Sequence, residues 1–220
     1  MTLSRSEIQS GTTDELGHFR DLLETLDEEA WRSPSRCEGW RVADVAAHLV
    51  GSVTDVVEGR LDGLGSPEVT AREVQERDGR SAGDLAQELG SSTKAAAEIL
   101  ATFDDAGWES PAPGGYPGTV GQGVEAIWSD AWQHANDIRA ALGRAPVAGP
   151  GQRATLHHIA EHLELMRWGP ATLAFEGGEE IPVGGGGRRI SGDPHAFILA
   201  ATGRADPAPL GLDPSVNIYA

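Results

Sequence analysis

The segment Trp128-Ser-Asp-Ala-Trp-Gln-His-Ala-Asn-Asp-Ile-Arg-Ala-Ala-Leu-Gly143 places Asp130, His134 and Asp137 at positions i, i+4 and i+7. On an α-helix this spacing puts the three side chains on one stripe. Apolar residues repeat with the same period, so the stripe borders the buried face. They are Val124, Ile127, Ala131, Ala135, Ile138 and Leu142. Because burial of an unpaired polar group is costly, the pattern predicts a helix whose inward carboxylate and imidazole have a partner such as a metal ion.

A second imidazole in a similar position is His48, which lies at the edge of the apolar face formed by Val45, Leu49 and Val53. If its helix neighbours the first one, His48 and His134 can reach one point, with Asp130 one turn away as an oxygen ligand. Two imidazoles and one carboxylate leave coordination positions open, as in catalytic zinc sites and ferrous facial triads. The alternative is that each histidine is a core residue with no ligand.

Four long amphipathic segments precede residue 145 and predict a helical bundle. They cover residues 16–26, 42–61, 81–103 and the segment that ends at Gly143. The third opens with Ser81 and Asp84 at capping-box spacing. A Gly- and Pro-rich connection over residues 107–123 predicts a surface crossover between helices.

The composition changes after residues 145–151, where Pro and Gly become frequent. The remaining chain predicts a helix over residues 154–168, a strand at 188–190, a helix capped by Asp193 and a final strand at 216–219. We therefore expect a mainly α protein, with residues 1–148 forming a DinB-like four-helix bundle and residues 149–220 forming a small α/β C-terminal domain. That domain has too few residues for a large core, so we expect it to pack on the bundle.

The net charge of −17 argues against nucleic acid or an anionic membrane as a partner, because both need a cationic surface. The single cysteine, Cys37, excludes an internal disulfide and is typical of a reducing compartment. The N-terminal residues contain no apolar signal-peptide core, and no segment reaches membrane-spanning length. We therefore expect a cytoplasmic protein that acts on small molecules.

Three further features have ordinary structural interpretations. His158 and His162 have the i, i+4 spacing of metal ligands, with Glu161 beside them, but a polar helix face explains them as well. Cys37 precedes a helix and is expected to be a small packing residue rather than a reactive thiol. The run Gly184–Gly187 lacks the Lys-Ser/Thr ending of a phosphate loop and predicts a flexible hairpin.

Two blocks of the sequence also resemble a known family. Ser35-Arg-Cys-Glu-Gly-Trp-Arg-Val-Ala-Asp-Val-Ala-Ala-His-Leu49 is similar to the first block of the mycothiol-dependent maleylpyruvate isomerase family, within the DinB-like superfamily. Residues 130–144 resemble its second block, and Leu199-Ala-Ala-Thr-Gly-Arg204 is similar to part of its C-terminal domain. The two blocks together, in this order, are more specific than either alone.

The resemblance implies a divalent metal, most often zinc, held by His48, Asp130 and His134. Family members commonly carry glutamate where this chain has Asp130, so the metal identity is open. It also implies a thiol cofactor such as mycothiol, and either isomerisation of a small electrophilic substrate or sulfur transfer to it. In this interpretation Asp137 orients His134, and Arg204 holds a carboxylate of the substrate or cofactor.

Two alternatives use the same residues differently. The His-Asp-His site could activate water in a hydrolase or lyase that needs no thiol. A protein of this fold could also bind a ligand without catalysing a reaction. The resemblance favours the thiol-dependent enzyme, with the C-terminal domain presenting Arg204 towards the metal.

Overall fold

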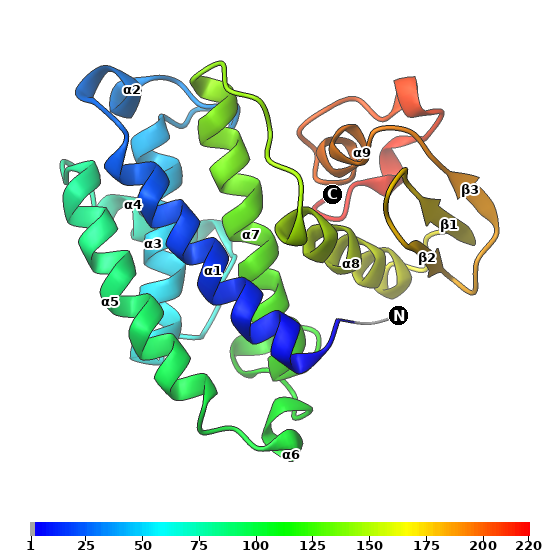
Figure 1. Cartoon of the computed structure of the whole chain (residues 1–220), viewed down its shortest axis with the longest axis horizontal. Coiled ribbons are helices and arrows are strands. Elements are labelled where there is room, and N and C mark those ends of the chain that lie inside the picture. The colour runs from blue at the N-terminus through cyan, green and yellow to red at the C-terminus, as the bar shows by residue number, and fades with distance from the viewer. Residues whose placement is uncertain (1–2) are drawn as a thin grey trace. The chain divides into compact units, whose positions relative to one another are not determined.

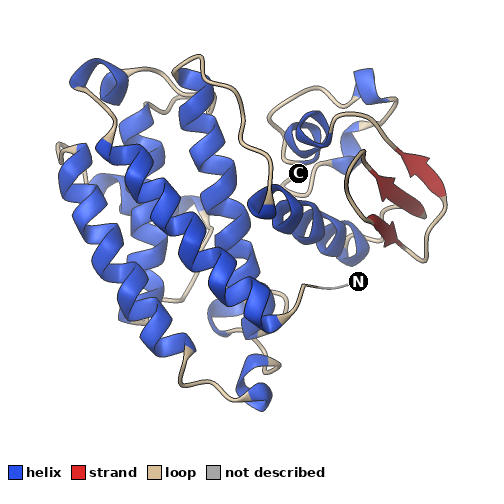
Figure 2. Cartoon of the chain, in the orientation of Figure 1, coloured by secondary structure: helices blue, strands red, loops and turns tan. Residues whose placement is uncertain are grey.

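A computed structural model describes residues 3–220, which divide into two compact units (Figure 1). One unit is Ser4–Pro146, and the other contains Val147–Ala220. Helices make up the first unit, whereas the second combines helices with a small sheet (Figure 2). The mainly α fold with a small α/β C-terminal part is therefore confirmed.

The first unit is built from four long helices: α1 (Arg5–Glu24), α3 (Val42–Glu58), α5 (Ala82–Leu100) and α7 (Val120–Ala141). Helices α1 and α3 each pack against both α5 and α7, which gives a ring in the order α1, α5, α3, α7. The chain therefore crosses the bundle between α1 and α3 and again between α5 and α7. The predicted four-helix bundle with a long crossover is confirmed.

The bundle core consists of the apolar faces of these four helices, as their periodicity predicts. Its fully buried members include Phe19, Leu23, Val45, Leu49, Leu85, Leu89, Ala131 and Ile138. Helix α5 starts with the expected capping box, in which Ser81 and Asp84 exchange side-chain and backbone hydrogen bonds. Gly143, just beyond α7, has a φ of 66°, which is the left-handed conformation common after helix ends.

Short elements connect the long helices. They are α2 (Glu28–Arg32), α4 (Pro67–Glu76), α6 (Asp105–Trp108) and the 3₁₀ turn η1 (Pro113–Gly115). Helix α4 packs on α3 and is the largest element that the sequence analysis missed. Its apolar content is low, because Val69, Ala71 and Val74 are the only apolar residues after Pro67 in a largely polar sequence.

The second unit contains α8 (Pro150–Leu165), β1 (Ala171–Ala174), β2 (Glu180–Val183), β3 (Arg188–Ile190), α9 (Pro194–Ala201), η2 (Ala208–Leu210) and η3 (Pro214–Val216). The strand order is β2-β1-β3, with β2 antiparallel and β3 parallel to β1. Helix α8 packs against α9 and β2. Asp193 caps α9 and Pro194 is its first residue, as expected.

Two sequence predictions in this unit are wrong. Residues 216–219 do not extend the described sheet: Asp213 caps the turn η3 instead, and the N–H of Ile218 donates to the carbonyl of Ala201 at the end of α9. The run Gly184–Gly187 is not a hairpin loop, because β1 lies between β2 and β3. The connection must pass the width of one strand, which a tight turn between paired strands does not do.

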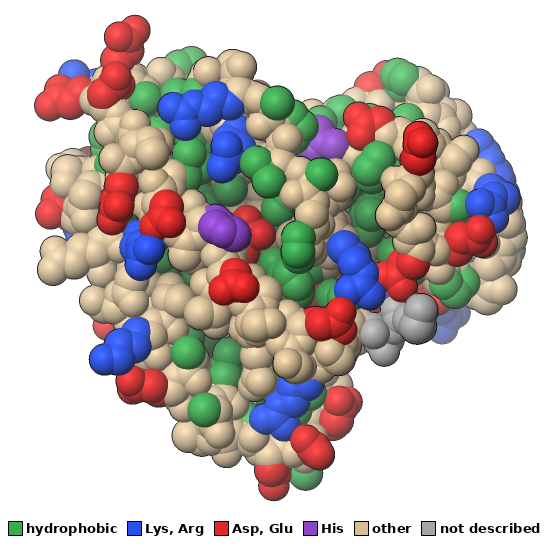
Figure 3. Space-filling model, in the orientation of Figure 1, with side chains coloured by type: hydrophobic (Ala, Val, Ile, Leu, Met, Phe, Trp, Pro, Cys, Tyr) green, Lys and Arg blue, Asp and Glu red, His purple; other side chains and the backbone are tan. Residues whose placement is uncertain are grey.

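The visible face of the molecule carries acidic side chains over both units, with basic side chains between them, and the acidic groups do not gather into one patch (Figure 3). This spread matches the excess of Asp and Glu in the composition. Among the described helices, none combines the length and apolar character needed to cross a membrane.

Candidate metal centre

Asp130, His48 and His134 come together inside the bundle, where α3 and α7 pack side by side. Their candidate ligand atoms all lie within 4.8 Å of one another. The Asp130 carboxylate sits between the two imidazoles, with Oδ2 3.7 Å from Nε2 of His48 and Oδ1 3.3 Å from Nε2 of His134. The two rings are nearly perpendicular, at 89°, with centroids 5.2 Å apart.

These separations fit a common divalent metal. Two ligands at zinc distances of about 2.0–2.1 Å in tetrahedral geometry lie roughly 3.3–3.4 Å apart, close to the Asp130–His134 separation. Both histidines are buried, whereas the Asp130 side chain is 33% exposed. The arrangement therefore offers two buried nitrogen ligands and one oxygen ligand that reaches solvent, which leaves room for an exogenous ligand.

A buried carboxylate lies behind each imidazole. Nδ1 of His134 is 3.0 Å from Oδ2 of Asp137, and Nδ1 of His48 is 2.7 Å from Oε2 of Glu73. Both carboxylates are at most 1% exposed. An imidazole that donates Nδ1–H to a carboxylate keeps the Nε2 lone pair for a metal, an arrangement common behind metal-bound histidines.

Asp137 therefore lies beside His134, where the sequence led us to expect it. Glu73 was missed by the sequence analysis. Glu73 lies on α4, which begins with Ser66 as its N-cap and Pro67 as its first residue. This Ser-Pro start is a recognised helix signal and could have revealed α4. No local pattern reveals that Glu73 is buried against His48.

The charges around His134 favour a cation at its Nε2 atom. Burial by itself lowers the pKa of His134, but the charge of Asp130 and hydrogen bonds with Asp130, Asp137 and Cys37 raise it well above its usual value. These acidic neighbours favour the positively charged form of the imidazole. A divalent cation at Nε2 would meet the same favourable charges, in competition with a proton.

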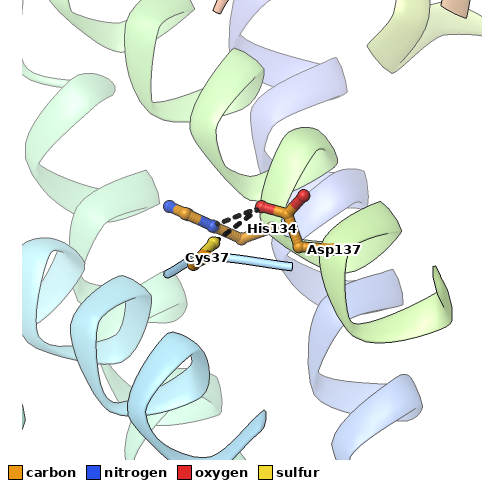
Figure 4. A group of neighbouring side chains, drawn as sticks. All are labelled: Cys37, His134 and Asp137. Carbon is orange, nitrogen blue, oxygen red and sulfur yellow. Dashed lines mark hydrogen bonds and ion pairs between the residues drawn. The ribbon is translucent and has the colours of Figure 1, made fainter. Parts of the chain in front are cut away.

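A second group forms around Asp137 (Figure 4). The Cys37 thiol donates to the same carboxylate oxygen that faces His134, at 3.4 Å, and Nε of Arg36 lies 3.5 Å from the other oxygen. Cys37 is half-buried and packs against the bundle core. Its sulfur, His134 and Asp137 also form a second group of candidate ligand atoms within 4.8 Å of one another, and its assignment as a packing residue stays a prediction. Its polar contact and the cation of Arg36 were not foreseen. Asp137 thus joins the loop before α3 to α7.

The other candidate residues lie in the second unit. On α8, the His158 and His162 rings are 4.3 Å apart, and Nδ1 of His162 is 3.1 Å from the His158 carbonyl. Within residues 3–220, neither belongs to the two groups whose ligand atoms converge. Arg204 follows α9, where its backbone N–H donates to the carbonyl of Leu199. Its assignment to an anionic ligand stays a prediction.

A family model and two solved structures similar to this chain all name the same kind of protein. A family model described as the mycothiol maleylpyruvate isomerase N-terminal domain matches residues 12–139. Two solved structures are similar: a mycothiol-dependent maleylpyruvate isomerase, with a TM-score of 0.64, and a variant of it with one histidine replaced by alanine, with a TM-score of 0.63. Each is 19% identical, and the similarity covers 93% of this chain and 93% of the other.

No curated protein matches the chain. At 19% identity the solved structures support the fold. The family model covers more than half of the sequence and includes His48, Asp130 and His134. The protein therefore belongs to the mycothiol maleylpyruvate isomerase family.

Proposed function

We propose that the protein is a metal-dependent enzyme that uses a low-molecular-weight thiol of the mycothiol type. The reaction is isomerisation of a small electrophilic substrate or sulfur transfer to it. The observation that supports this most is the convergence of two buried Nε2 atoms on the carboxylate of Asp130, in a chain of this family. The solved neighbours are described as mycothiol-dependent maleylpyruvate isomerases, which points to the same class of cofactor.

His48, Asp130 and His134 would hold the divalent metal, and zinc is the first candidate because the donors are two nitrogens and one oxygen. A bound zinc ion supplies Lewis acidity that stabilises a coordinated thiol as its thiolate. The chain contributes orientation: Asp137 contacts Nδ1 of His134, so Nε2 of that ring faces Asp130. The exposed side of Asp130 leaves access for a thiol and a substrate.

The function is tested by purifying the full chain without chelators and measuring its metal content by mass spectrometry. The protein is then incubated with cell thiol extracts and electrophilic substrates, with adduct formation and isomerisation followed. We expect one divalent metal per chain and turnover that requires the thiol. Turnover without any thiol would instead indicate a hydrolase or lyase. A metal-free protein with no turnover would indicate a binding protein.

We expect Arg204→Ala to raise the KM for an anionic substrate or thiol by about 10- to 100-fold, because a charge-assisted hydrogen bond contributes about 1.5–3 kcal/mol. Metal content should stay unchanged. Arg189→Ala is the matched control from the same unit, since Arg189 pairs with the equally exposed Glu180. The KM values of both variants are measured by steady-state kinetics. An unchanged KM for Arg204→Ala would show that Arg204 does not bind the ligand.

We expect Cys37→Ser to retain more than about a tenth of the turnover, because a hydroxyl can still donate to Asp137 and one neutral hydrogen bond is worth about 1 kcal/mol. The measurement is turnover at equal metal loading, with circular dichroism as the check on folding. A folded variant that loses more activity than this would show that the sulfur itself takes part in the reaction.

A further inference from the structure

Helix α4 brings a fully buried carboxylate to the back of the metal centre. Glu73 is 0% exposed, and its Oε2 atom lies 2.7 Å from Nδ1 of His48. Its other oxygen accepts a hydrogen bond from Ser52 at 3.2 Å. Among the described residues these are the partners of the carboxylate, so an imidazole and a hydroxyl accommodate its charge. In the part of the chain that the structure describes, no arginine or lysine forms an ion pair with this carboxylate, which is an unusual arrangement for a buried glutamate.

The side chain of Glu73 lies directly over the backbone of Gly51 on its way to His48. A Cβ atom at Gly51 would lie 2.6 Å from Cβ of Glu73 and 2.8 Å from its Cγ. No side chain fits there unless α4 moves. Gly51 lies in the middle of α3, where glycine costs about 1 kcal/mol relative to alanine. The notch that it leaves lets α4 approach closely enough for Glu73 to reach the imidazole.

Two ion pairs hold α4 in this position. Arg72 pairs with the fully buried Asp55 of α3, one turn beyond Gly51. At the other end, Arg77 donates to Glu88 of α5 at 2.6 Å, while its Nη1 atom donates to the backbone carbonyl of Glu73. Arg77 therefore hydrogen-bonds to the backbone of Glu73, while its guanidinium forms its ion pair with Glu88. The carboxylate of Glu73 is therefore available to hydrogen-bond with His48.

We propose that Glu73 is a positioning residue of the metal centre, which fixes His48 with Nε2 towards Asp130 and strengthens its hold on a divalent metal. The proposal rests on the function proposed above. An Nδ1–H that donates to a carboxylate selects one tautomer of the ring and increases the electron density at Nε2. Helix α4 is thus a functional part of the site as well as a cover of the bundle.

The test compares the full-length protein with Glu73→Gln and Glu73→Met. Glutamine keeps an oxygen that can accept the Nδ1 proton but removes the charge, whereas methionine removes both. Ser52→Ala is the control, because it changes the same cluster without touching the imidazole. Zinc affinity is measured by competition with a chromophoric chelator at fixed pH. Long-range ¹H–¹⁵N NMR of the metal-free protein reports the tautomer of His48, and circular dichroism checks the fold.

We expect Glu73→Met to weaken zinc binding by about 10- to 100-fold, and Glu73→Gln by less, as found for residues behind metal ligands. His48 should be protonated at Nδ1 in the wild type and Glu73→Gln, and should populate the Nε2–H form in Glu73→Met. Ser52→Ala should stay within about threefold of wild type, consistent with a modest net hydrogen bond.

The proposal is overturned if neither folded Glu73 variant binds zinc more weakly than Ser52→Ala. If Glu73→Met does not fold, the affinity of the nearly isosteric Glu73→Gln decides. A wild-type protein that binds no divalent metal would refute the proposed function. In that case the His48 tautomer still tests the orienting role of Glu73, and an unchanged tautomer in a folded Glu73→Met variant overturns it.

Discussion

His134→Ala is expected to lower zinc affinity by more than about 1,000-fold and to reduce thiol-dependent turnover to background, a larger effect than the 10- to 100-fold typical of residues behind the ligands. The variant loses one of three protein ligands. It also leaves the buried carboxylate of Asp137 without its imidazole partner. His48→Ala should behave in the same way, because the two rings occupy equivalent positions around Asp130.

The matched control is His162→Ala, which removes a histidine of the second unit that belongs to neither converging group within residues 3–220. Its zinc content and turnover should equal those of the wild type. Metal analysis after gel filtration and steady-state rates at saturating thiol give the comparison. If His134→Ala kept a full equivalent of zinc and normal turnover, the His48–Asp130–His134 site would have to be abandoned.

Gly11→Ala is expected to lower the free energy of unfolding by about 2 kcal/mol, although alanine is the better helix former by about 1 kcal/mol. A Cβ atom at Gly11 would lie 2.6 Å from Cζ3 of Trp128 and closer still to two other carbons of the same ring. The Trp128 side chain is 3% exposed, so it cannot move aside into solvent. Overpacking therefore outweighs helix propensity, and α1 is pushed away from α7.

Gly17→Ala on the same helix provides the control, because a Cβ there meets nothing within 4 Å. This variant should gain up to about 1 kcal/mol from helix propensity alone. Thermal unfolding separates the two, since about 2 kcal/mol corresponds to a decrease in Tm of roughly 4–8 °C for a chain of this size. An increase in Tm for both variants would mean that the Trp128 ring repacks without cost.

The bundle was predictable because its helices carry their own periodic pattern. The closeness of Asp130 and His134 was predictable for the same reason, since one helix turn fixes their separation. Glu73 was not, because α4 contains few apolar residues and its buried glutamate depends on Gly51, 22 residues earlier in the chain. The C-terminal strand at 216–219 was mispredicted, because the backbone N–H of Ile218 bonds to the end of α9 and not to a neighbouring strand.

The absence of a side chain at Gly51 allows α4 to pack closely on α3 at one position along that helix. The connection between the two helices is rich in glycine, and Gly59, Gly63 and Gly65 all have positive φ. A Cβ atom at Gly59 or Gly65 would meet nothing within 4 Å. The close approach at Gly51 and the Asp55–Arg72 and Arg77–Glu88 pairs fix the register of α4 independently of these two glycines. We therefore expect Glu73 to keep its place behind His48 even when the length of this connection changes.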